Sequence, residues 1–479
     1  MAYIKGEDRR QITFFPEAID DYVNEDNPVR VVDQFVGSLN MQELGFLRTN
    51  PNVTGRPPYD PRDLLKLYLY GYMNRIRSSR RLETEAGRNL ELLWLLQRLK
   101  PDFKTIADFR KDNKIALKNV FKQFSVLCRE WELFGREVVA IDGSKFRASN
   151  SRRNNFSEKK VQRHLKYIED KINTYLKELD DNDHEETDIH IPDAAEINKR
   201  IEELKKRQNK YLILQDKIKA NGGKEISTTD PDARMMATNN NGLDVAYNVQ
   251  TSVDDKHNLV VDCDITNNPA DQGQLSNMAK QAKETLAVEE IKALADKGYY
   301  SSKDLKECEE QKIQTFVPKP KNAGCIKNPE FHSNKFQYDK ENNCYICPAG
   351  QTLYFSSIRE VKDVQYQVYK NYRACKQYSL KENCTKNQKG RTVNRNIDQD
   401  LLDEIQNQTT ENKALYAKRQ MMVEHPFGTI KRSWGFNYFL TRGIESTRAE
   451  THLAFLAYNL RRVINILGVK EMISRLAVI

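Results

Sequence analysis

The stretches Val138-Val-Ala-Ile-Asp-Gly143 and Ile291-Lys-Ala-Leu-Ala-Asp-Lys-Gly298 decide the fold. Each is a short apolar run that ends in an aspartate before a turn, which is typical of a buried strand with a polar residue at its tip. Between them, residues 244–253 and 258–266 alternate like the two strands of a hairpin, with a turn at 254–256. Helical patterns at 271–286 and 302–311 flank the second stretch, and a short strand follows at 315–317.

This order of elements predicts an α/β core of the ribonuclease H-like type with a mixed five-stranded sheet, closed by a helical region that contains Glu424. The first and fourth strands of that fold are neighbours, so Asp142 and Asp296 are expected to meet at one sheet edge, where Glu424 could join them. Three carboxylates suit two Mg²⁺ or Mn²⁺ ions, which can act on both sides of a phosphodiester.

Other acids compete for this role. The turn aspartates have a sufficient explanation as turn residues. Asp262 and Asp264 alternate along a strand, so they share a face that is either solvated or a distal support. The competing residues are Asp230, Asp232, Asp254, Asp255, Asp262 and Asp264.

The rest of the chain predicts further parts around this core. An amino-terminal helical domain, with helical stretches at 82–99 and 105–133, carries arginines that either contact DNA phosphates or form a solvated helix end. Residues 157–225 predict a helical hairpin, which is a DNA-clamping arm, a dimer element or, the reading we favour, a solvated insertion. The arginines are Arg75, Arg77, Arg80 and Arg81. The boundaries are 1–134 for the helical DNA-binding or dimerisation domain, 135–156 and 226–318 for the core, 157–225 for the hairpin insertion, 319–395 for a Cys-rich insertion and 396–479 for the carboxy-terminal helical part of the catalytic core.

Charge and cysteine content limit the environment and the partners. The 479 residues carry a formal net charge of +9, which is compatible with nucleic acid but does not require it. The start, MAYIKGEDRR, lacks the apolar run of a secretory signal, and no stretch approaches the ~20 apolar residues that span a bilayer. We therefore expect a cytosolic protein, in which disulfides are uncommon.

The cysteines then divide into metal ligands and buried thiols. Four of them form two groups between the second and third acids, and four thiolates suit tetrahedral Zn²⁺ in a zinc-ribbon-like insertion. Cys128, Cys263 and Cys308 lie in apolar contexts typical of core thiols, and Cys325 has no assigned role. The four proposed zinc ligands are Cys344, Cys347, Cys375 and Cys384.

Several motifs resemble those of bacterial insertion-sequence transposases of the DDE group, which have a helical amino-terminal domain and a ribonuclease H-like catalytic domain. The motifs are Tyr59-Asp-Pro-Arg62, Phe109-Arg110, Val139-Ala-Ile-Asp-Gly-Ser144, Thr229-Asp-Pro-Asp-Ala-Arg234, Tyr247-Asn-Val-Gln250, Ala295-Asp-Lys-Gly-Tyr-Tyr300 and Val423-Glu-His-Pro-Phe-Gly-Thr-Ile-Lys431. The resemblance places the three acids at Asp142, Asp296 and Glu424. It also implies a bacterial protein associated with the nucleoid. These relatives often have a further cysteine where Tyr378 stands here.

The same relatives carry a Tyr, Arg, Glu, Lys signature, which matches Tyr416, Arg419, Glu424 and Lys431 with one extra residue between the Arg and the Glu. The resemblance implies that Arg419 and Lys431 contact phosphates at the transposon end. Trp434 either stacks on a displaced base or packs in the core, and core packing is slightly favoured.

The sequence therefore predicts a transposase that cleaves double-stranded DNA at paired inverted-repeat ends and joins the freed 3′-hydroxyl to target DNA as a homodimer. A ribonuclease H-like nuclease or resolvase would share the triad without joining ends. A non-catalytic DNA-binding protein derived from a transposase would bind without cleaving.

Overall fold

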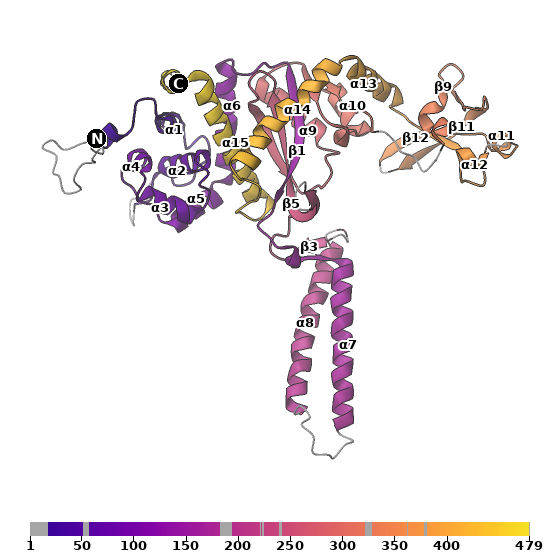
Figure 1. Ribbon diagram of the computed structural model, residues 1–479, viewed down its shortest axis with the longest axis horizontal. Coiled ribbons are helices and arrows are strands. Elements are labelled where there is room, and N and C mark those ends of the chain that lie inside the picture. Colours follow the sequence, from indigo (N-terminus) through magenta and orange to yellow (C-terminus); the bar gives the residue numbers. More distant parts are fainter. Residues whose placement is uncertain are drawn as a thin grey trace, which may run out of the picture.

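The computed structural model describes residues 18–50, 57–182, 194–220, 222, 225–238, 242–320, 328–361, 363–377 and 381–478. Figure 1 shows an elongated molecule, with the amino-terminal helices at one end, the main sheet in the middle and a small β-rich lobe at the other end. A two-helix arm projects sideways from the middle. None of the described helices is both long enough and apolar enough to cross a bilayer.

The described amino-terminal part is helical. A short 3₁₀ turn, η1 (Ile19–Tyr22), leads into α1 (Pro28–Gly37), α2 (Pro61–Met73), α3 (Ser79–Ala86), α4 (Leu90–Leu95), α5 (Phe103–Asp112) and α6 (Lys114–Glu130). Each helical stretch predicted at 82–99 and 105–133 is thus a pair of helices. Asp102, rather than Thr105, begins α5, because its carboxylate accepts hydrogen bonds from the backbone N–H groups of Lys104 and Thr105.

The main sheet has the strand order β4-β5-β1-β7-β8, with β6 also paired to β5. The predicted five strands are present in the expected order, and a sixth strand was not foreseen. The extra strand, β4, pairs with the first half of β5, whereas β6 pairs with the second half of the same edge. The bounds are β1 (Val138–Arg147), β4 (Arg234–Thr238), β5 (Gly242–Asp254), β6 (Val260–Thr266), β7 (Ile291–Leu294) and β8 (Ile313–Phe316).

Helices cover both faces of this sheet. Helix α9 (Leu275–Leu286) packs on β1, β5 and β6, and α14 (Lys413–Phe427) packs on β1 and β5. Helix α15 (Ile444–Leu467) packs against α6 as well as β6, so one hydrophobic core continues from the amino-terminal helices into the sheet. Helices α10 (Ser302–Glu310), α13 (Gln399–Glu411) and α16 (Val469–Leu476) complete this body.

Helices α7 (Glu158–Asn182) and α8 (Ala194–Ala220) lie where the sequence predicts a helical hairpin. They stand on a two-stranded platform of β2 (Asn155–Ser157) and β3 (Glu225–Ser227). Val161, Ile218 and Ile226 form a small buried cluster that joins both helices to the platform. The arm therefore has its own packed base next to the core (Figure 1).

The Cys-rich region forms a second, antiparallel sheet with the order β13-β12-β11-β10-β9. Its members are β9 (Gln337–Asp339), β10 (Cys344–Ile346), β11 (Thr352–Val361), β12 (Val364–Lys370) and β13 (Thr392–Asn396), with the short helices α11 (Tyr372–Lys376) and α12 (Lys381–Cys384) beside them. Cys325 and Tyr378 lie outside the described residues. A buried cluster around Tyr369 and Leu353 gives this lobe a core of its own.

Candidate active site

Asp142 and Asp296 come together because their strands are parallel neighbours. Ala140 of β1 lies opposite Leu294 of β7, so an aspartate follows two residues beyond this pair on each strand. The carboxylate of Asp296 accepts a hydrogen bond from the Gly298 backbone N–H at 2.7 Å, which fixes the turn after β7. The predicted meeting of the first and fourth strands is therefore present.

The Asp142 carboxyl group is largely buried and lies close to other carboxylates. Burial raises its pKa to about 6, and the Arg419 guanidinium opposes this rise, whereas the charges of Asp296 and Asp271 add to it. The Arg419 Nη1 atom lies 3.9 Å from Asp142 Oδ1, with 18% and 29% of the two side chains exposed. Tyr416 is close enough that the charges of Asp296 and Asp142 help raise its pKa, after burial, while Arg419 lowers it. Helix α14 thus presents a cation to the first aspartate.

Glu424 lies in the same helix but does not join the aspartates. Helix α14 continues through Pro426 and passes into a π-helical turn, η6 (Gly428–Ser433), so a helix does not start at this proline. The Glu424 side chain is exposed and accepts a hydrogen bond from Gln420 Nε2 at 2.8 Å. Within the described residues, no three His, Cys, Asp or Glu side chains are arranged to hold a metal ion. The role of Glu424 stays a prediction.

Lys431 reaches back from the π-helical turn to the strand that carries Asp142. Its ammonium group donates to Ser144 Oγ and to the Lys145 carbonyl oxygen, each at 2.8 Å. Burial, followed by the charge of Lys145, lowers the pKa of Lys431 to about 8. Asp142 and Ser144 point to the same face of β1 because side chains alternate along a strand. Two cations thus lie along this face of β1, Arg419 at Asp142 and Lys431 at Ser144.

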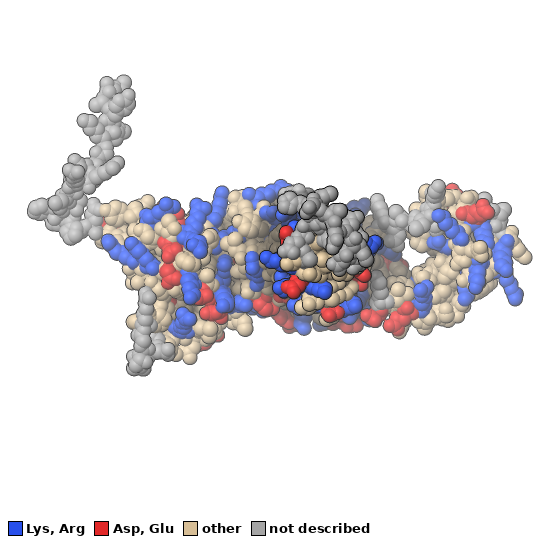
Figure 2. Space-filling view, turned by 90° about the horizontal axis from the view of Figure 1, so that it is seen from below, with Lys and Arg blue, Asp and Glu red and all other residues tan. Residues whose placement is uncertain are grey.

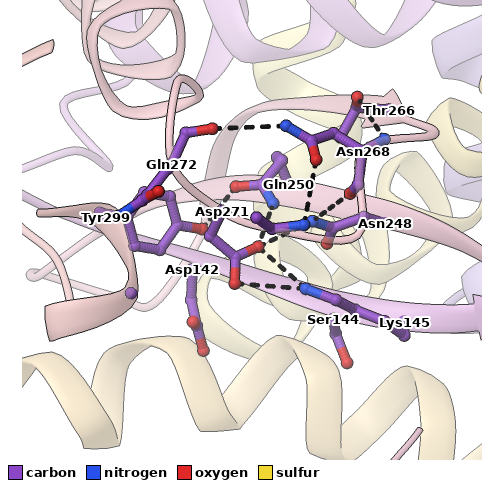
Figure 3. Close-up of polar contacts among 12 residues, drawn as sticks. Asp142, Ser144, Lys145, Asn248, Gln250, Thr266, Asn268, Asp271, Gln272 and Tyr299 are labelled. Carbon is purple, nitrogen blue, oxygen red and sulfur yellow. Dashed lines mark hydrogen bonds and ion pairs between the residues drawn. The ribbon is translucent and has the colours of Figure 1, made fainter. Parts of the chain in front are cut away.

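Asp271, which the sequence analysis did not single out, organises the opposite face of β1 (Figure 3). It lies in the loop between β6 and α9 and forms an ion pair with Lys145 at 3.0 Å. Its Oδ1 also accepts hydrogen bonds from Asn248 Nδ2 at 2.7 Å and Gln250 Nε2 at 3.0 Å. Both amides are buried on β5. Buried polar side chains in an apolar strand need a hydrogen-bond partner, so these two amides were the feature of the sequence that indicated a residue such as Asp271.

Gly143 allows this network to approach the strand. A Cβ atom at this position would lie 2.3 Å from Gln250 Nε2, 2.6 Å from Asp271 Oδ1 and 2.9 Å from Asn248 Oδ1. Asp271 Oδ2 would also lie 3.8 Å from a Cβ atom at Gly298, in the turn after Asp296. Asp271 thus touches both the strand of the first aspartate and the turn of the second.

The oxygen atoms gathered here fit a divalent cation. Carboxylates are the ligands that Mg²⁺ and Mn²⁺ prefer, and a buried carboxylate beside two others gains most from added positive charge. Asp142 has this environment, and Asp296 adjoins it. The chemistry of Asp142 and Asp296 therefore fits a divalent cation, and the full set of metal ligands stays a prediction.

The competing aspartates have structural roles. Asp230 Oδ1 accepts from the Tyr247 hydroxyl and the Gly443 N–H, and Asp232 Oδ2 accepts from the Ile444 N–H, so the two anchor the start of α15. Asp254 accepts from backbone N–H groups of the loop before β1.

The two strand aspartates also have local explanations. Asp264 pairs with Arg448 at 2.7 Å. Asp262 is only 1% exposed, so a solvated face is excluded for this residue. Both lie on β6, one strand further from β1 than β5.

His425 also has a structural role. Its Nδ1 lies 2.7 Å from the Tyr458 hydroxyl, and its Nε2 lies 3.1 Å from Arg462 Nη1. Both ring nitrogens of His425 thus have partners within the protein. A part-buried Trp434 also packs against the main core.

The four predicted DNA-contacting arginines differ in their surroundings. Arg75, Arg80 and Arg81 are exposed. Arg77 instead lies over the rings of Phe436 and Tyr438, at 4.2 and 4.8 Å, and pairs at 3.5 Å with the buried Glu450. Arg77 thus links the amino-terminal helices to the catalytic core, and its contact with DNA stays a prediction.

Three of the four predicted zinc ligands face one pocket in the Cys-rich lobe. Cys347, Cys375 and Cys384 line it together with Phe331 and Phe336. Burial raises the pKa of Cys384, Arg391 lowers it, and the charges of Cys375 and Cys347 raise it, which places the three thiols near one another. Cys344 does not line this pocket; it precedes Tyr345, which packs in the lobe core, and neighbours on a strand point to opposite faces.

Two family models match the chain. Residues 17–112 match the family described as "Transposase domain (DUF772)", and residues 346–464 match the family described as "Transposase DDE domain". The second match contains Glu424 and Lys431 and ends within α15, whereas Asp142 and Asp296 precede it. No curated protein and no solved structure matches the chain.

Proposed function

Because the chain is a DDE transposase, with an amino-terminal transposase domain and a DDE catalytic domain that act in DNA transposition, we propose that Asp142, Asp296 and Glu424 hold two catalytic Mg²⁺ or Mn²⁺ ions. The observation that carries the proposal is the position of Asp142 and Asp296 after paired residues of two parallel strands. Helix α14, which bears Glu424, packs on β1 of that pair.

Bound ions of this kind would activate the attacking oxygen and stabilise the leaving oxygen of the phosphodiester. The protein itself supplies the cations that surround the acids. Arg419 and Lys431 would bind the non-bridging oxygens of the phosphate, because both are held beside the same face of β1. Both groups now have protein partners, which DNA phosphates would replace.

The amino-terminal domain supplies further proposed contacts. Arg75, Arg80 and Arg81 are exposed cations that can meet phosphates along the transposon end. Tyr416 lies near Asp142 and Asp296, and Trp434 follows the π-helical turn that carries Lys431; both would border the DNA there. Cleavage at two paired ends implies two active sites, so we propose that the active complex is a homodimer.

We also propose a structural Zn²⁺ in the Cys-rich lobe. Cys347, Cys375 and Cys384 line one pocket, which supports the proposal, and their thiolates would have to move closer together to bind one ion. Cys344 would complete the set if β10 turned at its end, since it is three residues before Cys347. The ion would hold α11 and α12 against the small sheet.

The decisive experiment is Mn²⁺-dependent cleavage of DNA that carries the sequences flanking the gene. We expect the wild type to nick this DNA at defined ends. Asp142→Asn, Asp296→Asn and Glu424→Gln should bind the DNA but lower the cleavage rate by at least ~10³-fold, because each removes a metal ligand. Asp403→Asn, which neutralises a surface carboxylate that lies 3.6 Å from Lys319 and accepts a hydrogen bond from Gln399, is the matched control.

Each outcome has a distinct meaning. Full cleavage by any of the three variants would remove that residue from the metal site. Cleavage without joining of the 3′ end to target DNA would mean that the proposed strand-transfer chemistry is wrong. End binding by the wild type without any cleavage would leave a DNA-binding protein.

A further inference from the structure

The charges of the two-helix arm are divided along its length. The inner half, residues 158–170 of α7 and 205–220 of α8, carries ten Lys and Arg residues and four acids. The described outer half, residues 171–182 and 194–204, carries four bases and six acids. The ten inner cations are Lys159, Lys160, Arg163, Lys166, Lys205, Lys206, Arg207, Lys210, Lys217 and Lys219. A merely solvated insertion has no need of such a division.

The inner cations are not neutralised by the protein. Nine of the ten are exposed, and the tenth, Lys160, donates to the backbone carbonyls of Arg153 and Asn155. Among the described side chains, none of the ten forms an ion pair, whereas Arg200 in the outer half pairs with Glu196 at 2.7 Å. The inner half thus keeps its full charge available for a polyanion.

The cations from the two helices also converge on one face. His164 of α7 stacks on Tyr211 of α8, with ring centroids 4.8 Å apart. After burial, the charges of Lys160, Arg207 and Arg163 hold the pKa of His164 below its usual value. Like charges from both helices therefore lie close together, an arrangement that costs free energy until an anion binds.

The basic half of the arm is the half that lies closer to the active site. The arm follows directly after β1, the strand of Asp142, and its inner half stands on the β2–β3 platform next to the core. In Figure 2, which looks along the arm toward the core, Lys and Arg side chains gather around the arm and on the helical lobe beside it. The basic half is the half next to the core, and the acidic half points away from it (Figure 1).

We propose that the inner half of the arm grips the phosphate backbone of duplex DNA that leaves the active site. The 16 residues of α8 in the inner half span about 24 Å, a length over which duplex DNA carries about 14 phosphate charges. The acidic outer half repels the same backbone and so limits the contact to the base of the arm. The inference rests on the proposed action at DNA ends and adds a second, non-catalytic DNA contact.

The test compares two variants of equal charge change in the full-length protein. The inner variant is Arg163→Gln/Lys166→Gln/Arg207→Gln/Lys210→Gln, which spares Lys160 and the buried arm residues. The outer control is Lys171→Gln/Lys177→Gln/Lys199→Gln/Arg200→Gln. Binding of a fluorescent duplex that contains the gene's flanking end is measured by anisotropy across a salt series, with EDTA present so that no cleavage occurs.

We expect the inner variant to weaken binding by at least tenfold and to reduce the slope of log K against log salt by about 2–4, because each lost phosphate contact contributes about 0.9. The outer control should change both values little. Helix content and melting temperature, measured for both variants, establish that the arm still folds.

Equal effects of the two variants would overturn the proposal, since net charge alone would then explain them. So would unchanged binding by the inner variant, or a loss confined to its dimerisation in sedimentation analysis. Because the assay needs no cleavage, it is independent of the metal-site assignment. Failure of the wild type to bind the flanking end more tightly than an unrelated duplex would instead refute the proposed action at DNA ends.

Discussion

The closest packing in the active site is at Gly143, so Gly143→Ala is the sharpest test of the polar network. The added methyl group would meet three polar atoms at 2.3–2.9 Å, all closer than carbon normally approaches. β1 is held on both sides by β5 and β7, so the side chains must give way rather than the strand. The amides of Asn248 and Gln250 would then lose their hydrogen bonds to Asp271.

The size of the effect follows from these two bonds. A hydrogen bond to a charged group contributes about 1.5–3 kcal/mol. Asp271 is 23% exposed, so water compensates in part and we take the low end, about 3 kcal/mol in total. At roughly 2–4 °C for each kcal/mol, the catalytic core should melt about 6–12 °C lower. Cleavage should also slow, because Asp142 is the preceding residue.

Thermal unfolding followed by circular dichroism measures this loss, and Gly37→Ala is the matched control. A Cβ atom at Gly37 in α1 meets nothing within 4 Å, so this change should leave stability equal or raise it by about 0.5–1 kcal/mol. Combining Gly143→Ala with Gln250→Ala should cost less than the sum of the two, because the amide that the methyl displaces is already gone. An unchanged melting temperature, or strict additivity, would refute the packing argument.

Three other predictions concern separate parts of the molecule. Arg77→Lys should destabilise the protein by about 2–4 kcal/mol in urea unfolding, because it loses the ring contacts and weakens the pair with the buried Glu450, whereas Arg81→Lys on the exposed surface should not. Burial lowers the pKa of His452 to about 4, below its unfolded value near 6.5, so the unfolded state binds more protons between these values. Stability from His452 should therefore be present above pH 6.5 and fall by up to about 3 kcal/mol as pH drops toward 4, and His452→Gln should flatten that part of the stability curve. Removal of Zn²⁺ with a chelator should expose thiols to Ellman's reagent. Cys347→Ser should abolish this effect, whereas Cys128→Ser should not. A metal content of zero in the purified protein would contradict the zinc site.

The sequence was sufficient to predict the elements that place the two aspartates. Val138–Asp142 and Ile291–Asp296 are apolar runs that end in an acid, and their short length and the glycine that follows each acid mark them as strands. The neighbouring position of the two strands follows from the order of elements. These local patterns are strong because both strands are buried on both faces.

What the sequence did not predict depends on pairing between distant segments. β4 is short, and its partner is the first half of a strand whose second half already has a partner. Asp271 follows Asn268-Pro-Ala, so it reads as a loop residue. The separate position of Cys344 depends on the strand register in the small sheet, which its spacing from Cys347 does not reveal.

Asp142, Asp296 and Asp271 lie near one another, and their existing contacts indicate which two of them bind the metal ions. Asp271 already accepts hydrogen bonds from Lys145, Asn248 and Gln250, so its charge is balanced and its oxygens are largely used. The nearest cation to Asp142 is 3.9 Å away, and the hydrogen bond that Asp296 accepts comes from the neutral Gly298 N–H. A cation entering the site would displace three good bonds at Asp271 but none of comparable strength at the other two. We therefore assign Asp271 to positioning the strand and the turn. Asp271→Asn should accordingly lower the free energy of unfolding more than it weakens the free energy of metal binding.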